Sequence, residues 1–240
     1  MKVRASLIAL LAVWGLGVCT AAAQPATLSS QPASPAAGYK LDPEFNTSSP
    51  DGSIAIEQYV NKETDDYKWQ FWMRRQGTFA RLDPEAAGYP ADFLFTDDLK
   101  RIVREQKTGS GEATLYLYRL ASRGGVRTSR QPLGDRAWAF LRSRPDWRKI
   151  AKKPEYHQSA SLLDGFEKNY RSLGVRWPAQ RYLLITLSAD ADIKGRKPMQ
   201  TSVLHGWRCR YDLQTGRFDV PAVFSSHNAK ALVPKSPGDL

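Results

Sequence analysis

Short runs in which apolar and polar residues alternate recur along most of the chain. The runs that predict strands are 54–60, 69–73, 79–82, 92–96, 101–106 and 113–118, followed by 182–187 and 207–211. A period of two puts one face of a strand in a core and the other in solvent. Pro, Asp and Gly residues between the runs supply turns. The pattern predicts a domain built mainly from antiparallel β-hairpins.

Two of these runs follow similar turns, which indicates an internal repeat. "SPDGSIAIEQ" begins at Ser49 and "FTDDLKRIVREQ" at Phe95, so that Ile54 recurs as Ile102, a shift of 48 residues. "YDLQTGRF", from Tyr211, belongs to a third unit. These segments resemble the blade hairpins of exported β-propellers with TolB-like repeats. Since a propeller has about four to eight blades, three units transfer no function to this chain.

Helical patterns interrupt the strands. Residues 134–141 place three apolar side chains on one stripe, and Pro145 suits the first turn of a second, short helix. From Ser159 to Leu173 apolar residues recur every three or four positions, which predicts an amphipathic helix that ends at Gly174. We therefore expect a mainly β (α+β) fold, an antiparallel sheet or sandwich of repeated β-hairpins with a helical insertion at about residues 134–174.

The first 23 residues have the layout of a secretory signal peptide. Lys2 and Arg4 precede an apolar run, and three alanines precede the expected cleavage point after Ala23. The apolar run is shorter than the roughly 20 residues needed to cross a bilayer, and no later run is longer. The rest of the chain divides into a disordered Pro/Ala/Ser linker at 24–40, one globular domain at 41–235 and a tail at 236–240.

Cleavage changes both the charge and the cysteine count. The formal net charge of +11 falls to +9, because residues 1–23 contain two cations and no acid. Only Cys209 remains after the loss of Cys19, so no internal disulfide can form. An exported chain without disulfides indicates a bacterial periplasm or the extracellular space. On a strand, Cys209 shares a face with Trp207 and Tyr211, which favours a buried structural thiol over an intermolecular disulfide or a nucleophile.

The sequence contains no recognisable catalytic or metal-binding motif. Three scattered histidines and one cysteine lack the spacing of a metal site, and no serine lies in a Gly-x-Ser-x-Gly turn. Residues 190–195 resemble the start of a calcium loop, but Lys194 occupies a ligand position. We therefore predict no catalytic residue, no metal and no cofactor.

One stretch concentrates positive charge. It contains six cations, with two interleaved tryptophans and a single opposing acid, Asp146. We call these six cations the basic stretch: Arg142, Arg144, Arg148, Lys149, Lys152 and Lys153. Such a patch can bind polyanions through counterion release. It can also be the solvated side of two helices whose tryptophans pack inward.

These observations predict an exported, periplasmic, non-enzymatic domain whose partner is an anionic envelope polymer or an acidic protein rather than nucleic acid. Two alternatives stay open. One is an envelope hydrolase with an Asp/Glu pair assembled from distant residues, which two facing carboxylates in a pocket would favour. The other is an inhibitor that binds an acidic protein, which an exposed hydrophobic patch beside the basic stretch would favour.

Overall fold

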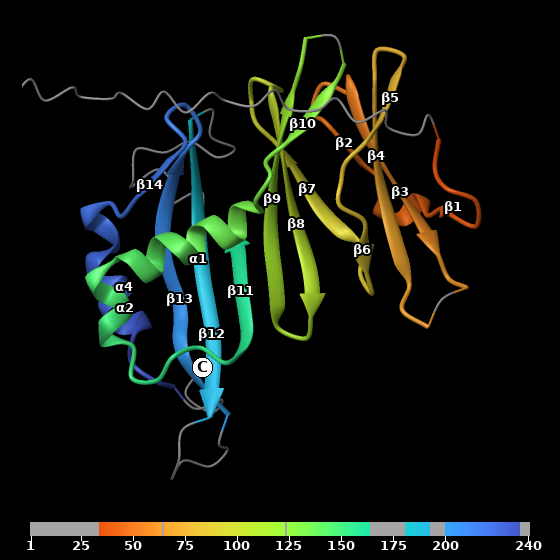
Figure 1. The fold of residues 1–240 in the computed structure, drawn as a ribbon. Coiled ribbons are helices and arrows are strands. Elements are labelled where there is room, and N and C mark those ends of the chain that lie inside the picture. The colour runs from red at the N-terminus through yellow and green to blue at the C-terminus, as the bar shows by residue number, and fades with distance from the viewer. Residues whose placement is uncertain (1–33, 64, 123, 164–180, 193–199, 236–240) are drawn as a thin grey trace, which may run out of the picture. The chain divides into compact units, whose positions relative to one another are not determined.

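The computed structural model describes residues 34–63, 65–122, 124–163, 181–192 and 200–235. Strands make up 49% and helices 17% of these residues, which confirms the predicted mainly β class. Three antiparallel sheets follow one another along the chain and stand side by side (Figure 1). The predicted signal peptide, residues 24–33 of the predicted linker and the predicted tail lie outside the described residues.

The first sheet has the strand order β1-β3-β4-β5, with β2 paired to β3 and β6 paired to β4. Its elements are β1 (Lys40–Leu41), η1 (Pro43–Phe45), β2 (Thr47–Ser48), β3 (Ile54–Asn61), β4 (Lys68–Arg75), β5 (Thr78–Arg81) and β6 (Ala86–Ala87). Every second residue of β3 is buried, as the alternation predicts. Ala36, from the predicted linker, donates its N–H to the side chain of Gln70 in this sheet (3.2 Å).

The second sheet lies between the other two and is covered on both faces. It has the order β10-β9-β8-β7, formed by β7 (Ala91–Phe95), β8 (Arg101–Gly109), β9 (Glu112–Leu120) and β10 (Val126–Thr128). Ile102 and Tyr118 pack with the first sheet. Val103 and Leu117 pack into the core of the third sheet and the first helix. Ile102 and Val103, which are adjacent on β8, therefore pack into two different cores.

The third sheet and the helices complete the described fold. The sheet has the order β11-β12-β13-β14, and helix α1 crosses in front of it (Figure 1). These elements are α1 (Leu133–Ser143), α2 (Pro145–Lys149), β11 (Tyr156–Leu162), β12 (Tyr182–Asp192), β13 (Gln200–Asp212), β14 (Arg217–Asp219), η2 (Ala222–Phe224) and α4 (Ser225–Ala231). Within the described ranges, no helix combines the length and the apolar character needed to cross a bilayer.

Helices α1 and α2 confirm the first half of the predicted insertion, but the helix expected from Ser159 is wrong at its start. Residues 159–162 belong to β11 and pair with β12. Ala160 is buried, and the N–H of Leu162 donates to the carboxylate of Glu105 (2.9 Å). Pairing with a long neighbouring strand outweighs the local helical spacing. The rest of the expected helix lies outside the described residues.

The turns of the first two repeat units have the same hydrogen bonds. The hydroxyl of Ser49 donates to Asp51 (2.7 Å) and accepts the N–H five residues later (3.0 Å). The hydroxyl of Thr96 donates to Asp98 (2.7 Å) and likewise accepts the N–H five residues later (3.1 Å). The turns are thus related by a shift of 47 residues, one fewer than the 48 predicted from the strands.

Cys209 lies in the core of the third sheet and is fully buried. Burial raises the pKa of its thiol far above the ordinary value, because the core disfavours a thiolate. The structural interpretation of this cysteine is confirmed. The thiol is neither accessible nor activated as a nucleophile must be.

Candidate anion-binding surfaces

The basic stretch runs from the last turn of α1 through α2 into the loop before β11. Arg142 is exposed on α1, Arg148 and Lys149 are exposed on α2, and the remaining members flank them in the chain. The structure brings these six cations into one region because they are close in sequence, without help from a distant segment.

Asp146 is the structural centre of the basic stretch. Its carboxylate lies 3.9 Å from Nε of Arg144 and 3.5 Å from Nζ of Lys149. It also accepts the indole N–H of Trp207, a fully buried side chain of β13 (3.3 Å). One acid therefore neutralises part of two cations and ties α2 to the third sheet.

Two lysines of the loop are also partnered. Lys152 pairs with Glu155 (2.9 Å) and donates to the carbonyl of Asp192 (2.6 Å). Lys153 donates to the carbonyl of Trp147, and its Nζ lies 4.6 Å from the centre of that indole ring. Among the six cations, only Arg142 and Arg148 have neither an acid nor a hydrogen-bond acceptor in the described part of the chain. The basic stretch is therefore largely engaged within the fold.

A second basic feature comes from strand pairing. Arg119 of β9 is directly opposite Arg101 of β8 and also directly opposite Arg127 of β10. We call these three residues the arginine row. Directly opposite residues of antiparallel strands project from the same face of a sheet, and like charges in such positions are destabilising. The fold thus holds three cations side by side at a cost in stability.

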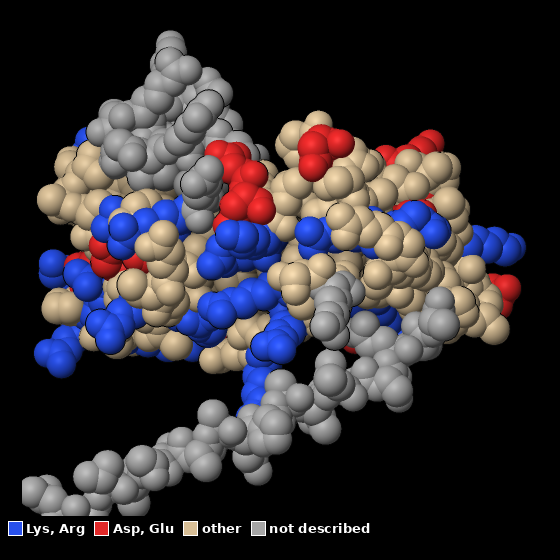
Figure 2. Space-filling model, turned by 90° about the horizontal axis from the view of Figure 1, so that it is seen from above, with Lys and Arg blue, Asp and Glu red and all other residues tan. Residues whose placement is uncertain are grey.

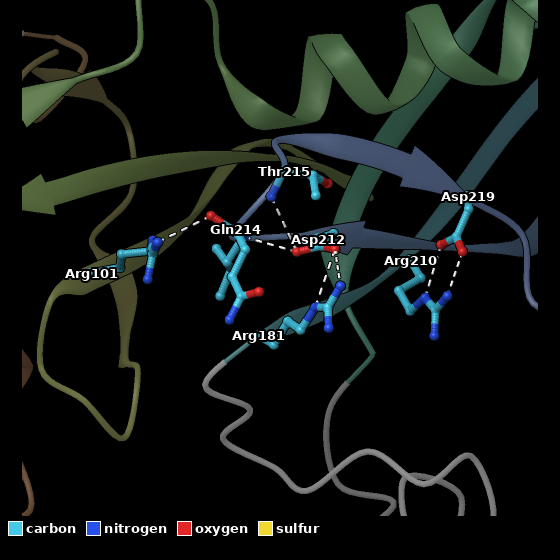
Figure 3. Close-up of polar contacts among 8 residues, drawn as sticks. Arg101, Arg181, Arg210, Asp212, Gln214, Thr215 and Asp219 are labelled. Atoms are coloured by element: carbon cyan, nitrogen blue, oxygen red, sulfur yellow. Dashed lines mark hydrogen bonds and ion pairs between the residues drawn. The ribbon is translucent and has the colours of Figure 1, made fainter.

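The members of the arginine row differ in how they are held. Arg101 donates to the carbonyl of Leu213 in the turn between β13 and β14 (3.0 Å), as Figure 3 shows. It also lies 3.7 Å from the carboxylate of Asp98. Arg119 and Arg127 are exposed, and neither has a carboxylate partner within the described ranges. The row therefore carries three cations against one acid.

Two arginines at the neighbouring third sheet show the opposite behaviour. Arg181 pairs with Asp212 (3.0 Å), and Arg210 forms a two-point contact with Asp219 (Nε to Oδ1, 2.8 Å), as Figure 3 shows. Burial tends to raise the pKa of Asp212, but hydrogen bonds from Arg181 and two backbone N–H groups outweigh it and lower the pKa. Arg181 and Arg210 are therefore neutralised locally, unlike Arg119 and Arg127.

A further cation reaches the turn that holds Arg101. Arg136 of α1 donates to the hydroxyl of Tyr211 (3.1 Å) and to the carbonyl of Gly216 (3.0 Å), neither of which carries charge. Figure 2 looks onto this end of the sheets and shows lysine and arginine side chains gathered over its middle. Positive charge is therefore concentrated where the second and third sheets meet the start of α1.

The arginine row is not recognisable in the sequence, because its members are 8 and 18 residues apart. One available signal was Gly124-Gly125. Gly124 has a φ of +81° and lies in the turn in which Ala121 bonds to Gly125. A hairpin centred there sets Arg119 opposite Arg127.

Two other features bear on the alternative functions. Asp92 of β7 is directly opposite Glu105 of β8, beside a hollow of about 340 Å³ that Lys107 and Glu112 also line. Between α2 and α4, a hollow of about 510 Å³ is lined by members of the basic stretch and by Val233, which is 58% exposed. Within the described ranges, no group of three or more His, Cys, Asp or Glu side chains is placed to hold a metal ion.

Comparison of the chain with protein-family models, with curated proteins and with solved structures finds no match. The functional argument therefore depends on the chemistry of these surfaces.

Proposed function

We propose that this protein is an exported, non-enzymatic binding domain for an anionic cell-envelope polymer, and that the arginine row is its main contact. The observation that carries the proposal is the register that sets Arg119 opposite both Arg101 and Arg127. An anionic ligand between these side chains would relieve their mutual repulsion. Guanidinium groups suit this task because their planar fork matches carboxylate and phosphate groups.

The dimensions of the row favour a polymer over a single small anion. Neighbouring strands lie about 4.8 Å apart, so three successive arginines span roughly 10 Å. A polymer with closely spaced acidic groups can contact all three at once. The unpaired members of the basic stretch, Arg142 and Arg148, provide a second and weaker contact for the same ligand.

Co-sedimentation of the mature chain with isolated wall and outer-membrane fractions tests the proposal. We expect binding at low salt that falls steeply as salt rises, since released counterions drive it. Arg119→Glu with Arg127→Glu abolishes it. Lys40→Glu with Lys68→Glu is the matched control, because it reverses two exposed cations of the first sheet and leaves the row intact. Absence of binding at low salt, or equal losses in both variants, contradicts the proposal.

The hydrolase remains a second candidate because Asp92 and Glu105 face each other across paired strands. Such a pair can divide acid and base roles if its two pKa values separate. Release of soluble fragments from wall material by the mature chain, abolished in Asp92→Asn, would replace the binding proposal with an enzymatic one.

The inhibitor remains a third candidate because the hollow beside α4 combines exposed Val233 with Arg144 and Lys149. A partner protein would bury that apolar surface, so Val233→Asp would remove its binding and leave polymer binding unchanged. The resemblance to TolB-like hairpins stays a prediction and contributes no activity.

A further inference from the structure

A groove runs along one side of α1, where the helix meets β9 and β11. Its volume is about 540 Å³, within the range of small-molecule and oligomer sites. Six side chains define its chemistry: Tyr116, Gln131, Asp135, Trp138, Arg142 and Gln158. Asp135, Trp138 and Arg142 recur at a spacing of three and four, so they lie on one face of α1 and extend about 10 Å along it.

The polar side chains of the groove are available to a ligand. Within the described ranges, Gln131, Asp135 and Gln158 are exposed and make no side-chain hydrogen bond to the protein. The buried Gln58 behaves differently. Its side chain accepts the N–H of Ala91 (3.0 Å) and donates to the carbonyl of the same residue (2.7 Å). The amide of Gln58 is therefore bonded at both its oxygen and its nitrogen, whereas the amides of Gln131 and Gln158 are not.

The mixture of groups selects a class of ligand. Amide side chains both donate and accept hydrogen bonds, Asp135 only accepts, and Arg142 only donates and carries positive charge. A simple polyanion would be repelled by Asp135. An acyl chain would find a lining with too little apolar surface. A sugar residue that carries hydroxyl groups and one acidic group satisfies the amides, Asp135 and Arg142 together, and the half-buried ring of Tyr116 borders the groove.

The groove also connects the two basic features. Arg142 is the first member of the basic stretch. On β9, Arg119 projects from the same face as Leu117, which packs into the core that contains α1, whereas Tyr116 projects from the opposite face. The row therefore lies on the α1 side of the second sheet. We propose that the groove binds an acidic polysaccharide chain, whose acidic groups contact Arg142 and the arginine row and whose hydroxyl groups contact Asp135 and the glutamines. This inference rests on the proposed function for its charge contacts and adds the saccharide class.

Titration calorimetry with two probes, polygalacturonate and inorganic polyphosphate, tests the inference on the mature chain. The groove variant is Asp135→Ala with Gln158→Ala. We expect it to lower the affinity for polygalacturonate about tenfold, since two hydrogen-bonding side chains are lost. Its affinity for polyphosphate should stay equal or rise slightly, because a negative charge has been removed. Opposite responses to the two probes distinguish saccharide contacts from charge alone.

The matched control is Asp97→Ala with Gln214→Ala, which deletes the same two side-chain types at exposed positions outside the groove. It should bind polygalacturonate at least as tightly as the unchanged chain. If thermal melting shows that the groove variant is unfolded, Gln158→Ala alone is compared with Gln214→Ala. Unchanged polygalacturonate binding in the folded groove variant overturns the inference. Binding of polyphosphate but not of polygalacturonate overturns it and leaves the proposed function standing, and binding of neither polymer overturns both.

Discussion

The basic stretch and the arginine row contain the same kinds of side chain but use them differently. In the basic stretch six cations are adjacent in sequence, and the fold engages most of them: Asp146 alone contacts Arg144 and Lys149. In the row three arginines come from separate strands, and one carboxylate faces them. A dense run of charge in a sequence therefore says less about ligand binding than unpaired charge placed by strand register.

The largest expected effect is on the free energy of unfolding of the protein, and it comes from removing the acid at the centre of the basic stretch. Asp146→Ala leaves the buried indole N–H of Trp207 without an acceptor and leaves Arg144 and Lys149 without their shared acid. We expect a loss of about 1–3 kcal/mol in the free energy of unfolding, measured by urea denaturation. Asp97→Ala, which removes an exposed acid without a described partner, should change it by less than about 0.5 kcal/mol. Equal values for the two variants would show that the stretch is not engaged as described.

The next effect is on polymer affinity, and it compares the two regions directly. Arg119→Gln with Arg127→Gln removes two unpaired cations and should weaken polyphosphate binding about tenfold at low salt. Lys149→Gln with Lys153→Gln removes two cations that already have partners and should weaken it about threefold or less. Titration at two salt concentrations gives both values. The reverse order of losses would falsify the assignment of the row as the main contact.

The same double variant of the row, which weakens polymer binding, should increase the stability of the protein. Neutral side chains remove the repulsion between directly opposite arginines, so Arg119→Gln with Arg127→Gln should raise the free energy of unfolding by about 0.2–1 kcal/mol. Loss of binding with gain of stability is the behaviour of residues retained for a ligand. A variant that loses both stability and binding would instead indicate that the row supports the sheet.

The strands were largely predictable, but the register that builds the row was not. Alternation identifies β8 and β9, and the turn at Ser110-Gly111 joins them. Gly109 pairs with Glu112, and that register alone would put Arg101 opposite Leu120. The register shift between Lys107 and Gly109 moves Arg101 opposite Arg119. A one-residue irregularity of this kind has no reliable signature in a single sequence, yet it decides which side chains share a face.

Which cations of the basic stretch are paired was equally unpredictable, because some of their contacts come from distant segments of the chain. Asp146 is recognisable in the sequence as the opposing acid, but nothing near it indicates that the indole of Trp207, 61 residues away, donates to its carboxylate. The predicted helix from Ser159 failed for a related reason, since β12 supplies a pairing edge that local periodicity does not contain. Local pattern predicts element type, whereas distant contacts decide which charges remain free.

The smallest expected effect on polymer affinity comes from Asp98, the acid beside the row. Burial tends to raise the pKa of Asp98, but bonds from Thr96 and the Lys100 N–H and the charge of Arg101 lower it overall. Asp98 is therefore ionised at neutral pH, and its stabilising effect is lost only as pH falls below about 3.8 through the lowered pKa. Asp98→Asn keeps the turn's acceptor and should tighten polyphosphate binding about twofold at pH 7. The unchanged chain should approach that affinity only below about pH 3.8, where Asp98 becomes protonated. Equal affinities at pH 7 would mean that Asp98 does not moderate the row, and that Arg119 and Arg127 alone set its affinity.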